Sequence, residues 1–352
     1  MKLLIIGGTR FLGRHVAAAA QTRGHEVTLF NRGNQASPFA VETIQGDRFT
    51  DLAKLSGRRW DAVVDTCGHV PRAVKAAAAA LSGSVDRYIF ISSQNAYASV
   101  SVPGVDESFP LATLTSEQLD QANAIDTTGQ PSYGALYGGL KALSEQAAQE
   151  AMPDRVLIIR PGLIVGPDDY SDRFTYWVVR VARGGEVLAP GRPDRFVQFI
   201  DVRDLAEWLV TMAEQKASGA YNTHGVPGQT TMQDLLEQCK SISDSDASFT
   251  WASEDFLLQE KIAAWTEMPL WLPEAAAPHL AGFMFVSPDK AIAAGLHFRS
   301  LSDTVRDTLT WYQANHLHDE LKAGLDRDKE QLMLNKLARS SIKSDQQRTM
   351  PP

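Results

Sequence analysis

The sequence of 352 residues lacks the features that mark several classes of protein. It has only two cysteines, Cys67 and Cys239, and no cysteine or histidine cluster at metal-binding spacing, so neither a disulfide framework nor a metal site is predicted. No apolar run approaches the ~20 residues of a membrane-spanning helix, and the four apolar residues after Lys2 are too few for a secretory signal. We therefore expect a protein of a reducing cytoplasm, with no membrane partner.

An excess of positive charge is absent as well. The chain has 34 lysines and arginines against 42 aspartates and glutamates, which gives a net charge of −8. This balance argues against a nucleic-acid partner. Hydrophobic residues make up 44% of the chain, so its length allows either two domains or one large domain with an added lobe.

The first half of the chain alternates short apolar runs with helical stretches. The apolar runs are KLLIIG, HEVTLFNRG, WDAVVDTCG and RYIFISS, and the helical stretches between them include FLGRHVAAAAQTRG and VKAAAAALSG. Such alternation predicts an α/β fold with a Rossmann-like, doubly wound parallel sheet. A further helix is expected from Tyr137 to about Ala151, and Gly24 is expected to follow the end of the first helix.

The domain organisation follows from this pattern. We place a dinucleotide-binding domain at residues 1–165, to which 194–225 returns, and a smaller C-terminal substrate-binding lobe at 166–193 and 226–312, where aromatic residues gather. Residues 313–352 form a charged extension, with a helix from His318 to Leu337 and a disordered tail from residue 340. The polar connection from Ser99 to Ser132 is long enough for a lid or a short helix.

A glycine-rich loop follows the first apolar run and predicts the cofactor site. Its sequence is GGTRFLG, that is Gly7, Gly8, Thr9, Arg10, Phe11, Leu12 and Gly13. Such a loop between a strand and a helix holds the pyrophosphate of a dinucleotide. Arg10 stands where a third glycine is usual.

Charge around this loop indicates which dinucleotide is preferred. About 20 residues on, an NAD site would carry an acid for the ribose 2′-hydroxyl, but this sequence has Asn31 and Arg32. Arg10 and Arg32 can pair with a 2′-phosphate through forked hydrogen bonds. We therefore predict NADP(H) as the preferred cofactor, with NAD(H) as the other option.

A serine, a tyrosine and a lysine form the candidate catalytic set. Tyr137 and Lys141 are four residues apart in a helical pattern and share one face, and Ser93 ends an apolar strand. A tyrosine phenol has a pKa of about 10, so proton transfer near neutrality needs a nearby cation. An ammonium at ~4 Å contributes about 4 kcal/mol at an effective dielectric constant of ~20. Ser93 would hold the substrate oxygen while Tyr137 exchanges a proton with it.

Several motifs occur in the order that one enzyme family uses. Besides the glycine loop they are Gly46-Asp47, FISSQNAY, YGGLKALSE, RPGLIVGP, FIDVRDLA and GAYNTHG, with SPDKAIAAGLHFRSLSDTVRDTLTWY after them. Over residues 1 to 312 the chain resembles the extended short-chain dehydrogenase/reductases of the epimerase/dehydratase branch. Parts of it are also similar to a subgroup with isoflavone-reductase-like members and chloroplast stem-loop-binding proteins, which bind RNA.

The resemblance implies roles for particular residues. Ser93, Tyr137 and Lys141 match the catalytic trio, Pro161 of RPGLIVGP falls in the cofactor site, and Asp47 matches the residue beside the adenine. From the sequence alone, an Asx turn after Gly46 explains Asp47 equally well. Family members often dimerise through the helix of the YxxxK segment, so the resemblance allows a homodimer.

Departures from the family pattern narrow the chemistry. Gln94 and Asn95 replace the acidic pair that sugar-nucleotide dehydratases use, and amides cannot act as general acids or bases. Leu163 stands where sugar-nucleotide enzymes place an asparagine on the diphosphate. We therefore predict an NADP(H)-dependent oxidoreductase that interconverts a carbonyl and an alcohol on a small, partly apolar substrate. A sugar-nucleotide epimerase and a nucleotide-sensing or RNA-binding protein on the same scaffold remain the alternatives.

Overall fold

The computed structural model describes residues 1–125, 133–315 and 320–348, with side chains as far as residue 339. The chain divides into two compact units. The first contains residues 1–164, 198–227 and 279–298, and the second contains residues 165–197, 228–278 and 299–352.

A seven-stranded parallel sheet lies at the centre of the first unit, in the strand order β11-β6-β5-β4-β1-β2-β3. Its strands are β1 (Lys2–Ile6), β2 (Glu26–Asn31), β3 (Glu42–Gln45), β4 (Trp60–Asp65), β5 (Val85–Ile91), β6 (Val156–Pro161) and β11 (Gly219–Thr223). The order confirms the predicted Rossmann-like sheet. Strands are added in one direction from β1 to β3 and in the other direction from β4 onward. Open sheets of this kind bind ligands at the point between the two, here between β1 and β4.

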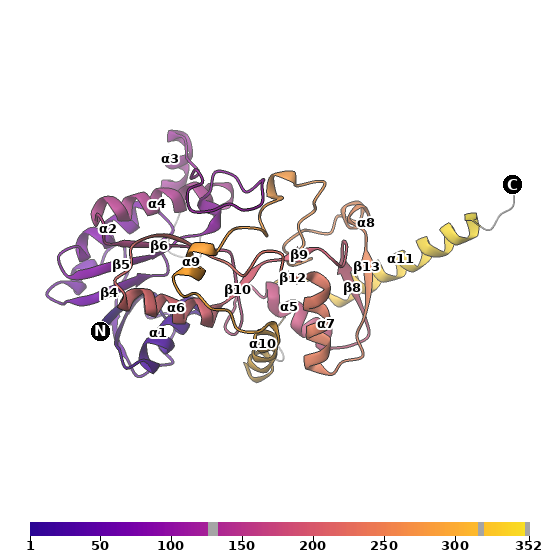
Figure 1. Ribbon diagram of the computed structural model, residues 1–352, viewed down its shortest axis with the longest axis horizontal. Helices are drawn as coiled ribbons and strands as arrows, with labels where there is room; N and C mark the ends of the chain where they lie inside the picture. Colours follow the sequence, from indigo (N-terminus) through magenta and orange to yellow (C-terminus); the bar gives the residue numbers. More distant parts are fainter. Residues whose placement is uncertain (126–132, 316–319, 349–352) are drawn as a thin grey trace. The chain divides into compact units, whose positions relative to one another are not determined.

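Helices cover both faces of this sheet. As Figure 1 shows, α1 (Phe11–Thr22) and α6 (Val202–Glu214) cover one face, and α2 (Pro71–Leu81) and α4 (Tyr137–Ala151) cover the other. Along β1, Leu3 and Ile5 are buried with the first pair of helices, whereas Leu4 and Ile6 are buried with the second. Because both faces are covered, the strand is apolar throughout, which is the pattern that predicted it.

The ends of two helices agree with the sequence prediction. Helix α4 has the predicted bounds, and Gly24 follows the end of α1 with a φ of 76° and donates its N–H to the carbonyl of Gln21. The polar connection from Ser99 contains the short helix α3 (Ser116–Ala124), which a capping box between Thr115 and Gln118 begins. Residues 126–132 of that connection lie outside the described residues.

One segment that the sequence analysis assigns to the lobe belongs to the first unit, namely His279–Phe298. Its helix α9 (Asp289–Ala293) packs on β11, and the indole N–H of Trp208 donates to the carbonyl of Ala294 at 3.0 Å. These contacts tie the segment to the sheet. The other short elements are η1 (Leu52–Leu55), η2 (Gln94–Ala96), η3 (Gly134–Leu136), β7 (Leu163–Val165), β10 (Phe199–Asp201) and η4 (Pro278–Leu280).

The second unit consists of helices with two small strand pairs. Strands β8 (Glu186–Pro190) and β13 (Ser248–Ala252) pair in parallel, and β9 (Phe196–Val197) pairs antiparallel with β12 (Thr230–Thr231). Helices α5 (Arg173–Ala182), α7 (Met232–Ser243) and α10 (Leu301–Asn315) pack together, and α8 (Glu254–Gln259) is a short helix. Trp177 and Trp271 are fully buried here, so these two aromatic residues serve the core of the unit.

The C-terminal helix differs from its sequence prediction at both ends. It was expected from His318 to Leu337, but α11 extends over Arg327–Arg348 and so includes part of the segment expected to be disordered. Asp326 sets its start, because its carboxylate accepts the N–H of Lys329 at 2.8 Å. Buried Glu330 then pairs with Arg180 of α5 at 2.5 Å. Residues 316–319 and 349–352 lie outside the described residues.

Candidate active site

The glycine loop joins β1 to α1 in a turn that has no room for side chains. Gly7 and Gly8 have φ values of 106° and 87°, which favour glycine. A Cβ on Gly13 would lie 2.8 Å from the Cα of Gly8, and a Cβ on Gly8 would lie 2.6 Å from the side chain of Leu29. A backbone this bare at the start of a helix allows the close approach of a phosphate.

The predicted specificity residues lie around the end of β2. Asn31 binds the loop, because its amide donates to the carbonyl of Gly7 at 3.4 Å while its oxygen accepts the N–H of Gly33 at 2.8 Å. The guanidinium of Arg10 donates to Gln35 at 3.1 Å, three residues beyond Arg32. Arg10 and Arg32 are both exposed. The two arginines therefore border the same loop, and neither is buried by the fold.

Asp47 forms the Asx turn that the sequence allowed. Its carboxylate accepts the N–H of Phe49 at 2.8 Å, and its own N–H donates to Asp51 at 2.9 Å. A contact between Asp47 and an adenine stays a prediction, since the turn accounts for the residue without one.

The residue after Asp47 carries a role that the sequence analysis missed. Arg48 makes two hydrogen bonds of 2.8 Å to Asp65 at the end of β4, and the hydroxyl of Tyr88 donates to the same carboxylate at 2.6 Å. Burial raises the pKa of Asp65, but the Arg48 guanidinium outweighs it and holds this pKa below the ordinary value. The buried charge lies beside Cys67, whose sulfur is 3.5 Å from Arg48. Burial raises the pKa of the Cys67 thiol.

Ser93 and Tyr137 come from two elements that are in contact. Ser93 follows β5 and its hydroxyl accepts the N–H of Asn95 at 3.2 Å. Tyr137 is the first residue of α4, and a side chain on the next residue, Gly138, would overlap the carbonyl oxygen of Asn95. The first turn of α4 thus packs directly on the turn after Ser93. Both Ser93 and Tyr137 are half-buried.

Lys141 lies one helical turn after Tyr137 and is 2% exposed. Its ammonium donates to the carbonyl of Ile91 at 2.6 Å and to that of Gly68 at 2.7 Å, and lies 4.3 Å from the ring centre of Phe90. Burial lowers the pKa of Lys141 to about 8, although nearby carboxylates oppose this effect. The structure therefore holds a cation at the carboxyl ends of β4 and β5, on the helix that carries Tyr137.

A buried network beside the predicted trio was also missed by the sequence analysis. Ser92 donates to Glu145 at 2.5 Å, and Arg160 donates to both oxygens of Glu145. Arg160 also donates to the Tyr97 hydroxyl at 3.0 Å, and this hydroxyl donates to Asn222 at 2.7 Å. The sequence offers one local sign of this network: Glu145 follows Lys141 by four residues in YGGLKALSE, which places both on one face of the helix.

Pro161 is the last residue of β6 and lies opposite Thr223 of β11. A side chain on Gly162 would overlap the ring of His224, so the glycine makes room for this buried histidine. Burial lowers the pKa of His224 to about 3, so its ring is neutral. The imidazole therefore packs as an uncharged side chain next to the predicted cofactor residue.

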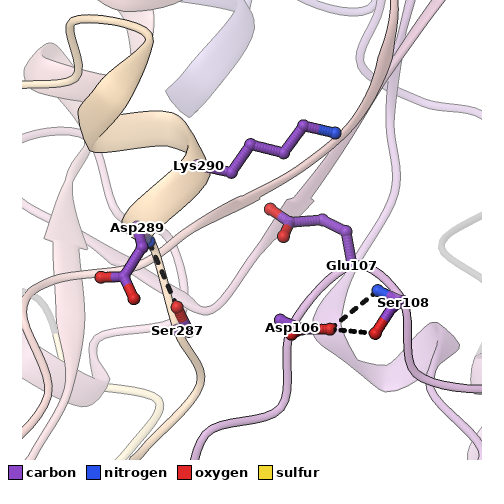
Figure 2. Close-up of a pocket in the computed structure, with 6 residues that line it drawn as sticks. All are labelled: Asp106, Glu107, Ser108, Ser287, Asp289 and Lys290. Atoms are coloured by element: carbon purple, nitrogen blue, oxygen red, sulfur yellow. Dashed lines mark hydrogen bonds between the residues drawn. The ribbon is translucent and has the colours of Figure 1, made fainter.

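Figure 2 shows a pocket in the first unit that contains none of the predicted site residues. Its volume is about 500 Å³, and it is lined by Asp106, Glu107, Ser108, Ser287, Asp289 and Lys290. Three of its four charged groups have partners: Asp106 accepts from Ser108, Glu107 accepts the N–H of Asn222, and Lys290 donates to a backbone carbonyl. Most of its charges are therefore paired within the protein, and the pocket lies apart from the predicted trio.

Two expected absences can be examined over the part of the chain that the structure describes. Within it, no three histidine, cysteine or acidic side chains come together as a metal site. None of the helices described is long and apolar enough to cross a membrane.

Two known proteins are similar to part of this chain in sequence. The chain is 27% identical over 245 residues to the chloroplast stem-loop binding protein of 41 kDa b of Arabidopsis thaliana, which covers 62% of this chain and 56% of that protein. It is 31% identical over 224 residues to a 2-alkyl-3-oxoalkanoate reductase of Stenotrophomonas maltophilia, covering 59% and 64%. The chain thus spans less than two thirds of the length of either relative.

A solved structure and a family model also match the chain. The fold matches that of a human epimerase family protein solved with NADPH, with a TM-score of 0.57, 17% identity, and coverage of 88% of this chain and 99% of that one. Residues 3–224 match the model described as the NAD dependent epimerase/dehydratase family. This range contains the glycine loop, the YxxxK helix and RPGLIVGP. As its motifs predict, the chain belongs to the NAD-dependent epimerase/dehydratase family.

Proposed function

We propose that this protein is an NADP(H)-dependent oxidoreductase that interconverts a carbonyl and an alcohol on a small, partly apolar substrate. The observation that carries the proposal is the buried ammonium of Lys141, which lies one turn from Tyr137 and bonds to Ile91, the last residue of the strand before Ser93. A buried cation next to a phenol favours the phenolate and so makes proton transfer by the tyrosine easier.

The residues present fit the cofactor. Gly7, Gly8 and Gly13 leave a backbone cradle that a Cβ would fill, which suits the pyrophosphate. Arg10 and Arg32 would pair with a 2′-phosphate. By the family resemblance, Asp47 would lie by the adenine, and the other predicted cofactor residues would complete the site, namely Thr9, Phe11, Leu12, Asn31 and Pro161.

The chain's own residues then perform the proton chemistry. NADPH, when bound, supplies a hydride to the carbonyl carbon. The Ser93 hydroxyl would donate a hydrogen bond to the carbonyl oxygen and hold it beside Tyr137. The Tyr137 phenol would give its proton to that oxygen, which becomes the alcohol, and the tyrosinate would recover a proton from water. The Lys141 ammonium stabilises the tyrosinate in the meantime.

The relative from Stenotrophomonas maltophilia suggests a substrate class to test first. That protein is described as a reductase of 2-alkyl-3-oxoalkanoates, which combine a ketone with apolar chains. We propose that ketones of this kind, rather than nucleotide sugars, are substrates, because Leu163 offers no hydrogen bond to a diphosphate.

A screen of carbonyl compounds tests the proposal directly. NADPH absorbance would be followed with neutral ketones, 3-oxo acids and aldehydes, and UDP and dTDP sugars would be titrated in parallel. Net NADPH consumption with a ketone supports the oxidoreductase. Micromolar binding of nucleotide sugars, with cofactor retained and no net turnover, would instead identify an epimerase that uses the same three residues.

The third function concerns RNA, because one relative is described as a stem-loop binding protein. Binding of a stem-loop RNA by the wild type that is unchanged in Tyr137→Phe, without carbonyl turnover, would favour this alternative. We also keep the cytoplasm as the proposed location and a homodimer as the proposed assembly. Light scattering of the purified protein checks the assembly.

A further inference from the structure

Helix α4 holds the end of β5 at two successive residues. Tyr137, Lys141 and Glu145 follow each other at four-residue spacing, which places them along one face of the helix. The ammonium of Lys141 bonds to the carbonyl of Ile91, and the carboxylate of Glu145 accepts the hydroxyl of Ser92 at 2.5 Å. These two hydrogen bonds fix Ile91 and Ser92, the residues directly before Ser93, against the helix.

The carboxylate of Glu145 is itself fixed. Glu145 is 1% exposed, and Arg160 of β6 donates to it through Nε at 3.1 Å and through Nη2 at 2.7 Å. The remaining end of the guanidinium bonds to Tyr97, which in turn bonds to Asn222 of β11. A side chain held by a buried, forked ion pair has one orientation, so Glu145 presents its oxygen to Ser92 in one place.

We propose that Glu145 is a positioning residue of this active site, which acts through Ser92 to hold Ser93 against the helix that carries Tyr137. The inference rests on the proposed function, since it assumes that Ser93 and Tyr137 face a common substrate oxygen. Glu145 itself is buried beneath the strand end and acts on the substrate only through its neighbours.

The charge of Glu145 has a second effect, on the ammonium one turn away. Burial lowers the pKa of Lys141 to about 8, and the ionisable groups that act on it include Asp65, Glu145, Arg48 and Cys67. The neighbouring His69 has a pKa lowered to about 4, so its ring is neutral where Lys141 titrates. The carboxylates of Asp65 and Glu145 favour the charged ammonium, whereas the guanidinium of Arg48 disfavours it. Removal of the Glu145 charge therefore lowers the pKa of Lys141 further.

A pair of buried serines tests the positioning contact. Ser92→Ala removes the hydroxyl that binds Glu145 and leaves the ion pair with Arg160 intact. Ser144→Ala is the matched control, because Ser144 is buried next to Glu145 on α4 and its hydroxyl has no hydrogen-bond partner among the residues that the structure describes. With the ketone found in the screen, we expect kcat of Ser92→Ala to fall about tenfold or more while KM stays within about twofold. Ser144→Ala should match the wild type. Wild-type kcat in Ser92→Ala would overturn the proposal.

A second measurement needs neither substrate nor cofactor. The Cε chemical shift of Lys141 is followed against pH by NMR in protein labelled at lysine Cε, and Lys141→Met assigns the signal. Glu145→Gln should move the titration to lower pH, and Glu150→Gln, an exposed change on the same helix, should leave it in place. An unchanged titration in Glu145→Gln would refute the role of Glu145 at this ammonium.

The two failures can be told apart. If no carbonyl compound is reduced, the proposed function fails, while the Lys141 titration still decides whether Glu145 acts on the site. If Glu145→Gln does not fold because Arg160 is left unpaired, the double variant Glu145→Gln/Arg160→Met removes both buried charges. A smaller shift of the Lys141 titration in the same direction is then expected, because the loss of the Arg160 cation partly offsets the loss of the Glu145 carboxylate. A titration at the wild-type pH or above it contradicts the proposal.

Discussion

Arg48 and Asp65 are joined by two hydrogen bonds of 2.8 Å each, and Asp65 has no exposed surface. The pair connects the turn after β3 to the end of β4, so it supports the segment whose Gly68 carbonyl accepts a hydrogen bond from the Lys141 ammonium. Loss of one partner leaves an uncompensated charge in the interior.

We therefore expect Arg48→Met to lower the free energy of unfolding by about 3 to 5 kcal/mol. Urea unfolding followed by fluorescence measures the change. The control is Arg58→Met, which breaks an exposed pair with Glu42 and should change stability by less than about 1 kcal/mol. Equal effects of the two substitutions would show that the buried pair does not support the fold.

Tyr137→Phe should abolish most turnover. Removal of a general acid typically lowers the rate by about 10² to 10⁴-fold, and NADPH affinity should stay within about twofold. Tyr133→Phe removes a hydroxyl from a neighbouring buried tyrosine and serves as the control. Steady-state kinetics and fluorescence titration of NADPH give both quantities. Full turnover in Tyr137→Phe would assign the proton transfer to another group.

Cofactor preference should follow the two exposed arginines at the glycine loop. In the double variant Arg10→Gly/Arg32→Asp we expect the preference to move from NADPH to NADH, because the aspartate would repel a 2′-phosphate and accept a bond from a free 2′-hydroxyl. Affinities for both cofactors are measured by titration, with Arg59→Gly as a control far along the chain. A wild type that favours NADH would contradict this account.

Stability should fall in mild acid because of His224. The pKa of its buried ring is lowered to about 3 from 6.5, so between these values the unfolded chain binds a proton that the folded chain does not. Linkage then predicts that stability drops as pH falls below about 6.5, by about 2 kcal/mol at pH 5 from this residue. Urea unfolding at pH 8 and pH 5 measures the drop.

A matched pair of variants isolates this effect. His224→Gln should remove about 2 kcal/mol of the loss at pH 5, whereas His279→Gln, at an exposed histidine, should keep the full loss of the wild type. The buried ring of His69, whose pKa is also lowered, to about 4, keeps its own contribution in both variants. If both variants lose stability in acid as the wild type does, other groups are responsible.

Gly138→Ala should be harmful although alanine favours helices. Its Cβ would overlap the carbonyl of Asn95, so the first turn of α4 would have to move away from the turn after Ser93. We expect a loss of about 1 to 3 kcal/mol in stability and a fall in turnover as Tyr137 shifts. Gly83→Ala, where a Cβ meets nothing within 4 Å, is the control. Thermal unfolding and kcat are the measurements.

Much of the fold could be predicted because its signals are local. Continuous apolar strands, the glycine loop and the helix from Tyr137 are each contained in a short stretch of sequence, and the structure has them where the pattern indicates. The C-terminal helix was misplaced because its start depends on a cap at Asp326 and on the buried pair between Glu330 and Arg180, which are 150 residues apart.

The supporting residues of the site were missed for the same physical reason. Arg48 and Asp65 are 17 residues apart, Ser92 and Glu145 are 53 apart, and Tyr97 and Asn222 are 125 apart. Spacing along the chain reveals neighbours within a helix or strand, but these pairs meet only after the strands of the sheet have assembled.

The apolar sequence of β1, the strand at the centre of the sheet, does not by itself fix its register against β2 and β4. Leu3, Leu4, Ile5 and Ile6 are all buried and nearly alike in volume, so a shift by one residue would exchange the two cores with little change in apolar burial. Alignment must come from the ends, where the N–H of Lys2 donates to Asp61 and that of Gly7 donates to Phe30. The glycine-rich turn that we propose for the cofactor therefore also fixes the register of this strand against its neighbours.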